Sequence, residues 1–213
     1  MALKTKNIGG GRSAGKQASG HLERRAAVIA LLGDTDDNDL LFVTGLAGSR
    51  SDVLEAVGAD CKRVYPLSGA MGAATSMALG LALAQPDKRV ICVTGDGELL
   101  MNVGTLATIS ILNPPNLAIL CVDNEHYGET GFQRSHTGLG VDLARIAEGC
   151  GIQAVRTVID EADFDEAGKL LRSGNGAGFV LLKVGVSDPP GVARNRDAVL
   201  NKAWFREAVL GKA

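Results

Sequence analysis

Hydrophobic residues in this chain gather into short runs that recur along most of its length. Six runs of four to seven residues are rich in β-branched and aliphatic side chains: 40–44, 63–66, 89–94, 116–122, 153–158 and 179–184. Unbroken apolar runs of this length are typical of strands that are buried on both faces. The pattern therefore predicts about six strands inside a sheet.

Segments with the spacing of helices lie between most of these runs. They are residues 21–32, 51–57, 70–84, 99–112, 142–150 and 162–172, with a final helix at 196–210 after a Pro-Pro turn. Strands that alternate with helices indicate a mainly parallel sheet with helices on both faces. We therefore expect an α/β fold of three layers, doubly wound, with a mainly parallel sheet of about six strands.

The first twenty residues differ from the rest of the chain. They are rich in Gly, Ser and Lys and show no periodicity, which is the composition of a mobile leader. The whole chain has 213 residues, a length that suits one globular domain. We expect a mobile leader at 1–20 and a single domain at 21–213.

Charge and hydropathy exclude several classes of protein. The 22 Lys and Arg against 24 Asp and Glu give a net charge of -2, which offers no basic field for nucleic acid. No apolar run approaches the roughly 18 residues of a membrane span, and the first residues lack the apolar core of a secretory signal. We expect a cytoplasmic protein with neither a nucleic-acid nor a membrane partner. Four widely spaced cysteines without a CxxC motif are expected to be buried small hydrophobes: Cys61, Cys92, Cys121 and Cys150.

Glycine-rich and polar turns follow four of the predicted strands. They are residues 44–49, 66–72, 95–98 and 123–128. In an open parallel sheet, ligands bind beyond the carboxyl ends of the strands. We therefore expect all four turns to lie on one edge of the sheet and to form the functional site.

Gly95-Asp96-Gly97 and Asn124 carry the clearest chemistry. The two glycines allow a sharp turn close to an anion, and Asp96 presents a carboxylate at the end of a strand. Between Gly97 and Asn124 lie 26 residues, which is room for one helix and one returning strand to the same edge. A carboxylate and an amide oxygen suit Mg²⁺, which shares its coordination shell with substrate phosphates. A helix starting near Leu99 would direct its N-terminal amides toward the same anion.

This arrangement resembles the cofactor and Mg²⁺ signature of thiamine diphosphate (TPP)-dependent enzymes. It is embedded in VICVTGDGELLMNVGTLATI and LCVDNEHYGETG, and the order of strand, GDG, helix, strand and Asn is far more specific than GDG alone. The resemblance covers residues 40–184. It is strongest with the sulfopyruvate and phosphonopyruvate decarboxylases, in LSGAMGAATSMALGLALA and DNEHYGETGFQRSHTGLGVDLARIAEGCGI.

The resemblance implies a metal site and a set of cofactor contacts. The side chains of Asp96 and Asn124 and the main-chain carbonyl of His126 would bind Mg²⁺. Glu98 stands where relatives often have Ser or Gly, so either its main-chain amide alone serves the phosphate or its side chain turns away. The implied cofactor-binding residues are Thr44, Gly45, Gly69, Met71, Gly95, Asp96, Gly97, Glu98, Asn124, His126, Tyr127 and Gly128.

Further roles follow from the same resemblance. The turn at Thr44-Gly45 would help to hold the diphosphate, and the carbonyl of Gly69 would accept from the aminopyrimidine. Met71 would be the apolar wedge that bends the cofactor, so that its own imino group reaches the thiazolium C2 proton.

The segment 126–136 would cover the reactive end of the cofactor. Arg134 or His136 would meet a substrate anion there, and His126 is a further candidate catalytic residue. The alternative for this segment is a solvated loop.

The resemblance also implies a partner. Relatives activate the pyrimidine N1′ with a glutamate from a separate pyrimidine-binding domain, and the residues before position 40 are too few to form one. An α subunit would therefore supply that glutamate, in a homodimer or an αβ hetero-oligomer. We predict the TPP- and Mg²⁺-binding subunit of a two-component 2-oxo acid decarboxylase that acts on a small 2-oxo acid.

Three alternatives stay open. The chain could be the β subunit of a 2-oxo acid oxidoreductase or an acetolactate-synthase-like carboligase, since both share the cofactor signature. A non-catalytic nucleotide-binding regulatory module is the alternative from another class. No G-x-G-x-x-G follows the first predicted strand, which weighs against that module.

Overall fold

The computed structural model of this protein describes residues 22–46, 48–187, 195 and 197–211. The leader predicted at 1–20 and the Pro-Pro turn at 189–190 lie outside the described residues. Within the described ranges, no helix combines the length and the apolar character needed to cross a bilayer.

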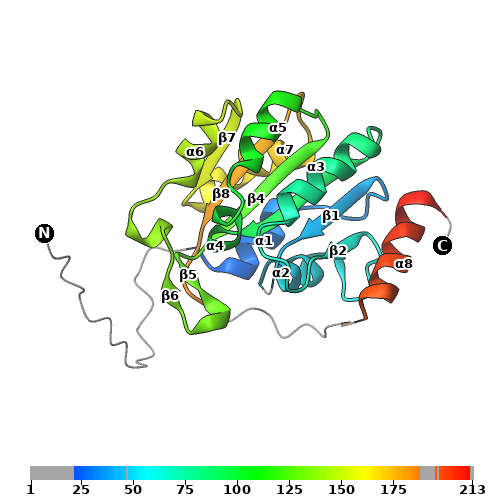
Figure 1. Ribbon diagram of the computed structural model, residues 1–213, viewed down its shortest axis with the longest axis horizontal. Helices are drawn as coiled ribbons and strands as arrows, with labels where there is room; N and C mark the ends of the chain where they lie inside the picture. Colours follow the sequence, from blue (N-terminus) through cyan, green and yellow to red (C-terminus); the bar gives the residue numbers. More distant parts are fainter. Residues whose placement is uncertain (1–21, 47, 188–194, 196, 212–213) are drawn as a thin grey trace, which may run out of the picture.

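Six parallel strands form the central sheet, in the order β2-β1-β3-β4-β8-β7 (Figure 1). They are β1 (Leu40–Thr44), β2 (Val64–Pro66), β3 (Arg89–Gly95), β4 (Leu117–Asp123), β7 (Ala154–Val158) and β8 (Gly178–Lys183). Each begins and ends within one residue of its expected bounds. The prediction of a parallel sheet of about six strands is confirmed.

Side chains of the central strands alternate between two apolar cores, one on each face of the sheet. In β4, Ala118 and Leu120 belong to one core, whereas Ile119 and Cys121 belong to the other. All seven residues of β4 are buried. Because both faces of the strand are covered, the sequence shows an unbroken apolar run here rather than alternation.

Helices supply the two outer layers (Figure 1). One core is closed by α1 (Arg24–Leu32), α2 (Gly48–Val57) and α7 (Phe164–Arg172). The other is closed by α3 (Ala74–Ala84), α4 (Asp96–Leu100), α5 (Thr105–Leu112) and α6 (Leu143–Gly149). The last helix, α8 (Ala198–Leu210), lies beside β2, where Phe205 packs edge-on against Tyr65 with ring centroids 5.2 Å apart. The predicted three-layer arrangement is confirmed.

Two helices differ most from the sequence prediction, whereas α1 begins three residues later than expected and α2 three residues earlier. The helix expected at 99–112 is broken into α4 and α5, and the side-chain amide of Asn102 in the break donates to the Gly72 carbonyl and to Ser76 Oγ. The helix expected at 70–84 begins only at Ala74, because Gly72 has a φ of 81°, which lies outside the helical region. Apolar spacing continues across both turns, so the pattern alone did not reveal them.

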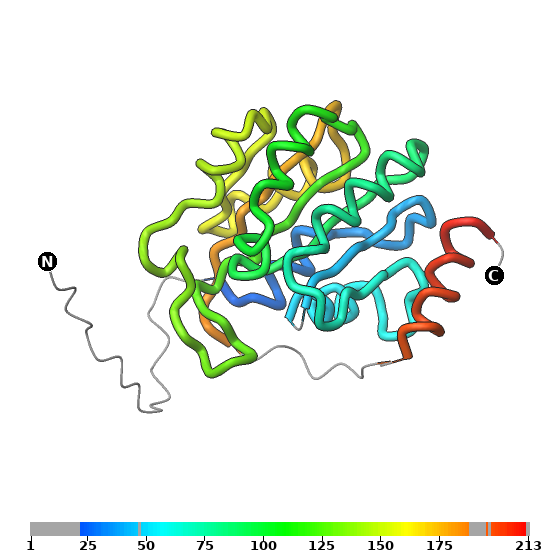
Figure 2. The backbone as a smooth tube through the Cα atoms, viewed as in Figure 1, coloured from blue at the N-terminus to red at the C-terminus, as the bar shows by residue number. Residues whose placement is uncertain are grey.

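The segment after β4 forms a small hairpin instead of an irregular loop. Its strands are β5 (His126–Tyr127) and β6 (Gln133–Arg134), with the 3₁₀ turn η1 (Gly128–Thr130) between them and η2 (Thr137–Leu139) after them. Figure 2 follows the backbone from the end of β4 into this hairpin and on toward α6. A further 3₁₀ turn, η3 (Glu161–Asp163), precedes α7.

The four cysteines are free, and they differ in burial. Cys92 and Cys121 are buried in the sheet as expected. Cys61 and Cys150 are only partly buried, because they lie in connections outside the sheet. The prediction of buried cysteines is therefore wrong for these two.

Candidate active site

The carboxyl ends of the parallel strands meet at a cavity of about 370 Å³. The sheet order places β1 beside β3, so the connections after these two strands leave in opposite directions and open a crevice between them. The volume is within the range of small-molecule sites. All four predicted turns contribute to the wall, at Leu46, Met71, residues 95–98 and Asn124 among others.

The structure brings nine of the twelve expected cofactor residues to this wall. They are Met71, Gly95, Asp96, Gly97, Glu98, Asn124, His126, Tyr127 and Gly128. Thr44 and Gly45 are buried but do not line the cavity, and Gly69 is exposed in its turn with a φ of 90°.

Two of the candidate catalytic residues also lie off the described cavity wall. Arg134 and His136 are exposed and do not line it. The Arg134 guanidinium donates to the Gly138 carbonyl, and His136 Nδ1 is 3.3 Å from the Tyr127 hydroxyl. His126 is the one of the three that reaches the wall. Arg134 and His136 therefore lie beside the described wall rather than on it, and their role toward a substrate anion stays a prediction.

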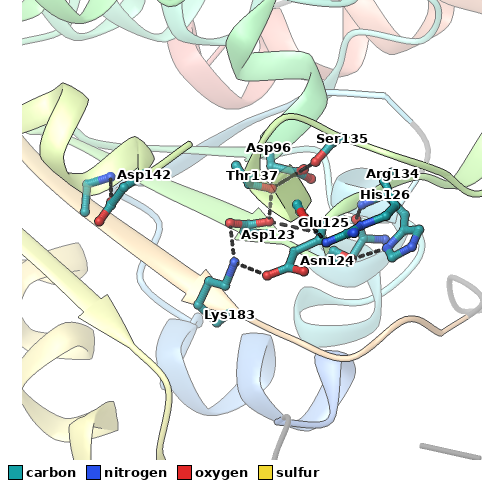
Figure 3. Close-up of polar contacts among 12 residues, drawn as sticks. Asp96, Asp123, Asn124, Glu125, His126, Arg134, Ser135, Thr137, Asp142 and Lys183 are labelled. Atoms are coloured by element: carbon teal, nitrogen blue, oxygen red, sulfur yellow. Dashed lines mark hydrogen bonds and ion pairs between the residues drawn. The ribbon is translucent and has the colours of Figure 1, made fainter. Parts of the chain in front are cut away.

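Asp96 is held in one orientation at the start of α4. The residue is only 2% exposed; its Oδ2 accepts a hydrogen bond from the Ser135 hydroxyl and lies 3.0 Å from the Thr137 hydroxyl (Figure 3). Burial raises the pKa of the Asp96 carboxyl, the Ser135 hydroxyl lowers it, and the charge of Asp123 raises it again. Neither Ser135 nor Thr137 was predicted, because both lie about forty residues further along the chain, beyond the strand-end motifs.

A second buried carboxylate lies beside Asp96. Asp123, 1% exposed, accepts from Thr137 Oγ1 at 2.7 Å and pairs with Lys183 Nζ at 2.9 Å (Figure 3). Lys183 also reaches Glu125 at 2.7 Å. Burial lowers the pKa of Lys183, but its hydrogen bonds to the two carboxylates outweigh that effect, and the net pKa is raised.

The carboxylates of Asp96 and Asp123 have too few hydrogen-bond donors around them, which favours a bound cation. Thr137 has one hydroxyl hydrogen, yet its oxygen lies within hydrogen-bond distance of carboxylate oxygens of both Asp96 and Asp123. Lys183 pairs with Asp123 and with the partly buried Glu125, and no Lys or Arg of the described residues pairs with Asp96. A divalent cation at the Asp96 carboxylate would compensate the charge that remains.

Asn124 is fixed at the end of the neighbouring strand. Its Oδ1 accepts from the His126 backbone N–H at 3.1 Å, and its carbonyl is 2.9 Å from His126 Nδ1. Because β3 and β4 are adjacent, Asn124 and Asp96 lie on the wall of the same cavity. Among the described residues, no group of three or more His, Cys, Asp or Glu side chains could hold a metal. A metal here would need amide, main-chain and ligand oxygens, which is the donor set that the sequence implied.

The direction of the Glu98 side chain, which the sequence left open, is defined in the structure. Its side chain points toward the turn after β1, where Oε2 accepts from the Leu46 N–H at 3.1 Å. A Cβ on Gly45 would lie 1.7 Å from that oxygen, so any side chain here would displace the Glu98 carboxylate. Burial raises the pKa of Glu98, opposed by the Leu46 amide. The other oxygen, Oε1, is buried and has no hydrogen-bond partner among the described residues, so a ligand that meets it must bring a hydrogen-bond donor or a cation.

The remaining wall is largely apolar. Met71, Val122, Tyr127 and Phe132 contribute to it, and the Tyr127 ring lies so close to Gly97 that a Cβ there would be 2.3 Å from the ring. The cavity thus has a polar part, formed by the turns after β1 and β3, and an apolar part toward Met71 and Phe132. Such a division suits an anion joined to an aromatic group.

Arg24 is a cavity residue that the sequence analysis missed. It stands at the start of α1, before the first strand, and no local motif marks it. It lines the cavity and pairs with Asp52 of α2 at 2.7 Å. Burial raises the pKa of Asp52 despite the attraction of Arg24.

Comparison with known proteins finds a family of cofactor-binding domains whose match includes most residues of this cavity. Residues 60–184 match the family described as thiamine pyrophosphate enzyme, C-terminal TPP binding domain. The chain is 47% identical to the sulfopyruvate decarboxylase subunit beta of Methanocaldococcus jannaschii over 46% of this chain and 52% of that protein. It is 34% identical to the sulfopyruvate decarboxylase subunit beta of Methanothermobacter thermautotrophicus over 85% of this chain and 93% of that protein.

A solved structure shares the fold. It is an X-ray structure described as a thiamin diphosphate-dependent enzyme from Mycobacterium smegmatis, with a TM-score of 0.59 and 19% sequence identity. The similarity covers 80% of this chain and 33% of that chain. Taken with the family match over residues 60–184, the sheet order and the strand-end cavity lead to one conclusion: this chain belongs to the thiamine pyrophosphate enzymes, through their C-terminal TPP-binding domain.

Proposed function

We propose that this chain is the TPP- and Mg²⁺-binding subunit of a two-component 2-oxo acid decarboxylase of the sulfopyruvate or phosphonopyruvate decarboxylase type. The observation that carries the proposal is the convergence of Asp96 and Asn124, from neighbouring strand ends, on the wall of one cavity. The similarity to two decarboxylase β subunits supports the reaction class.

The chain's own residues would hold the metal and the diphosphate. Asp96, Asn124 and the carbonyl of His126 offer oxygen ligands of the kind that Mg²⁺ takes. Ser135 and Thr137 keep the Asp96 carboxylate from rotating, so its position does not depend on the ligand. When bound, TPP supplies the electron sink that a 2-oxo acid needs to lose CO₂.

The apolar part of the cavity would orient the organic half of the cofactor and exclude water from it. Met71 is partly exposed at this wall, which suits a side chain that packs against a bound ring. Tyr127, packed over Gly97, and Phe132 bring the β5–β6 hairpin to the same wall. A low-dielectric wall strengthens the electrostatic interactions of the site.

We propose an α subunit as the source of the glutamate that activates the pyrimidine. The β-subunit similarity supports a two-subunit enzyme, and it makes a homodimer or an αβ hetero-oligomer the expected assembly. We also propose a cytoplasmic location, with which the four free cysteines agree.

The test is reconstitution of the chain with a pyrimidine-domain α subunit, TPP and Mg²⁺, followed by CO₂ release from a panel of 2-oxo acids. We expect CO₂ and the corresponding aldehyde, fastest from an acid with a second anionic group, and none from the chain alone. Formation of an acetolactate-type product, or reduction of an added electron acceptor, would replace this proposal with the carboligase or oxidoreductase alternative.

A further inference from the structure

Arg24 supplies the one permanent positive charge on the described wall of the cavity. Three carboxyl side chains share that wall: Asp96, Glu98 and Glu129. A diphosphate adds further negative charge, and one Mg²⁺ does not balance all of it. A second cation at the cavity would lower the electrostatic cost of binding.

The Arg24 guanidinium is fixed in place and keeps donors available. Its side chain is 9% exposed, and both Nε and Nη2 lie 2.7 Å from Asp52 Oδ2. A guanidinium has five N–H groups, so this pairing leaves three. Among the described residues, Asp52 alone accepts a hydrogen bond from Arg24. No other described residue takes the remaining donors, so they can meet a ligand.

Ser187 is a second polar group on the same wall whose partner is missing from the described part of the chain. Its hydroxyl oxygen is buried and has no hydrogen-bond partner there. The chain after β8 runs beside the residues before α1, where Leu22 pairs with Val184 and its carbonyl accepts from the Gly185 N–H at 3.1 Å. This pairing brings Ser187 and Arg24 to the cavity together.

We propose that Arg24 and Ser187 form a subsite that binds the diphosphate of the cofactor directly, with Asp52 as the residue that positions Arg24. The inference rests on the proposed function, since it takes TPP as the ligand. It adds two contacts from outside the GDG and Asn motifs. The Arg24 side chain binds the phosphate oxygens as a fixed cation, and the Ser187 hydroxyl donates to them.

The position of Arg24 favours the diphosphate over a substrate anion. Its guanidinium lies against Gly48, where a Cβ would be 2.2 Å from Nη2. Gly48 begins α2 directly after the turn of β1, and the amide of Leu46 in that turn faces Glu98. Arg24 thus belongs to the polar part of the cavity.

The test is binding of TPP, inorganic pyrophosphate and thiamine, each with Mg²⁺, to the assembled enzyme by isothermal titration calorimetry. The main variant is Arg24→Gln with Asp52→Asn, which avoids an unpaired buried carboxylate. We expect its Kd for TPP and for pyrophosphate to rise by about 10- to 100-fold, the usual contribution of a charge-assisted hydrogen bond. Ser187→Ala should raise both values severalfold. Thiamine affinity should stay unchanged.

Arg25→Gln is the matched control, because Arg25 is the exposed neighbour of Arg24 on α1. It should leave all three affinities unchanged. The proposal is overturned if the folded double variant and Ser187→Ala both bind pyrophosphate like the wild type, or if they alter only the KM for the 2-oxo acid. If the double variant does not fold, Arg24→Lys and Ser187→Ala are titrated in the same way. Wild-type Kd values for pyrophosphate in both would then overturn the proposal. Failure of the wild-type enzyme to bind TPP would instead refute the proposed function.

Discussion

Gly45 and Glu98 provide a direct test of how the polar part of the cavity is built. A methyl group added at position 45 would lie 1.7 Å from Glu98 Oε2 and 2.3 Å from Cδ, far inside van der Waals contact. In the Gly45→Ala variant, the carboxylate must move and give up its hydrogen bond to the Leu46 amide, while it stays buried. We therefore expect this change to destabilise the protein.

The size of the effect follows from the lost hydrogen bond. A hydrogen bond to a charged group contributes about 1.5–3 kcal/mol, so Gly45→Ala should lower the free energy of unfolding by about 2 kcal/mol. For a chain of this length that corresponds to a fall of about 4–8 °C in Tm. Urea denaturation followed by circular dichroism measures the change.

The same substitution should behave differently without the Glu98 carboxylate. The φ of Gly45 is not in the left-handed region, so alanine is compatible with the backbone there. In a Glu98→Ser background, Gly45→Ala should be neutral or stabilising by up to about 1 kcal/mol, because it restricts the unfolded chain. Gly80→Ala in α3 is the control, since open space surrounds that position. An equal cost of Gly45→Ala in both backgrounds would refute the reasoning.

Three other changes test the buried charges. Lys183→Met leaves the Asp123 carboxylate without its cation and should cost about 3 kcal/mol of stability in urea denaturation, the low end for a buried pair because the Lys183 side chain is 23% exposed; adding Asp123→Asn should recover most of it. Thr137→Val removes one of the two hydroxyl contacts of the Asp96 carboxylate and should weaken Mg²⁺ binding about 10- to 100-fold by calorimetry; an unchanged affinity would count against the positioning role. Burial raises the pKa of Asp52 above its ordinary value of 3.8, so the folded chain holds that proton to a higher pH than the unfolded chain does. This group therefore costs stability as the pH rises from about 4 through the raised pKa. Over that range the free energy of unfolding of Asp52→Asn should rise relative to wild type, and a relative fall would contradict the raised pKa.

The strands and the edge of the sheet that carries the site could be predicted from the sequence. Strands buried on both faces read as apolar runs, so their bounds were found within one residue. Parallel strands end on one edge, so the turns at residues 95–98 and 123–128 were expected together. Helix boundaries were less accurate, because a turn such as the one at Gly72 keeps the apolar spacing on either side.

The groups that support the site could not be predicted from the sequence in the same way. Arg24, Ser187 and Lys183 reach the cavity or its carboxylates through tertiary contacts that have no local signature. The direction of the Glu98 side chain depends on the missing side chain at Gly45, 53 residues earlier. A sequence motif identifies the residues at the ends of the strands. The side chains that contact them are brought there by tertiary packing, which no local motif reveals.

Metal-dependent binding of TPP is the measurement that tests the central claim most directly. Titration of the assembled enzyme with TPP should show binding with Mg²⁺ and none after chelation by EDTA. Asp96→Ala should remove the Mg²⁺-dependent binding, whereas Asp87→Ala, an exposed carboxylate at the opposite edge of the sheet, should leave it intact. A folded Asp96→Ala variant that binds TPP with wild-type, Mg²⁺-dependent affinity would contradict the account.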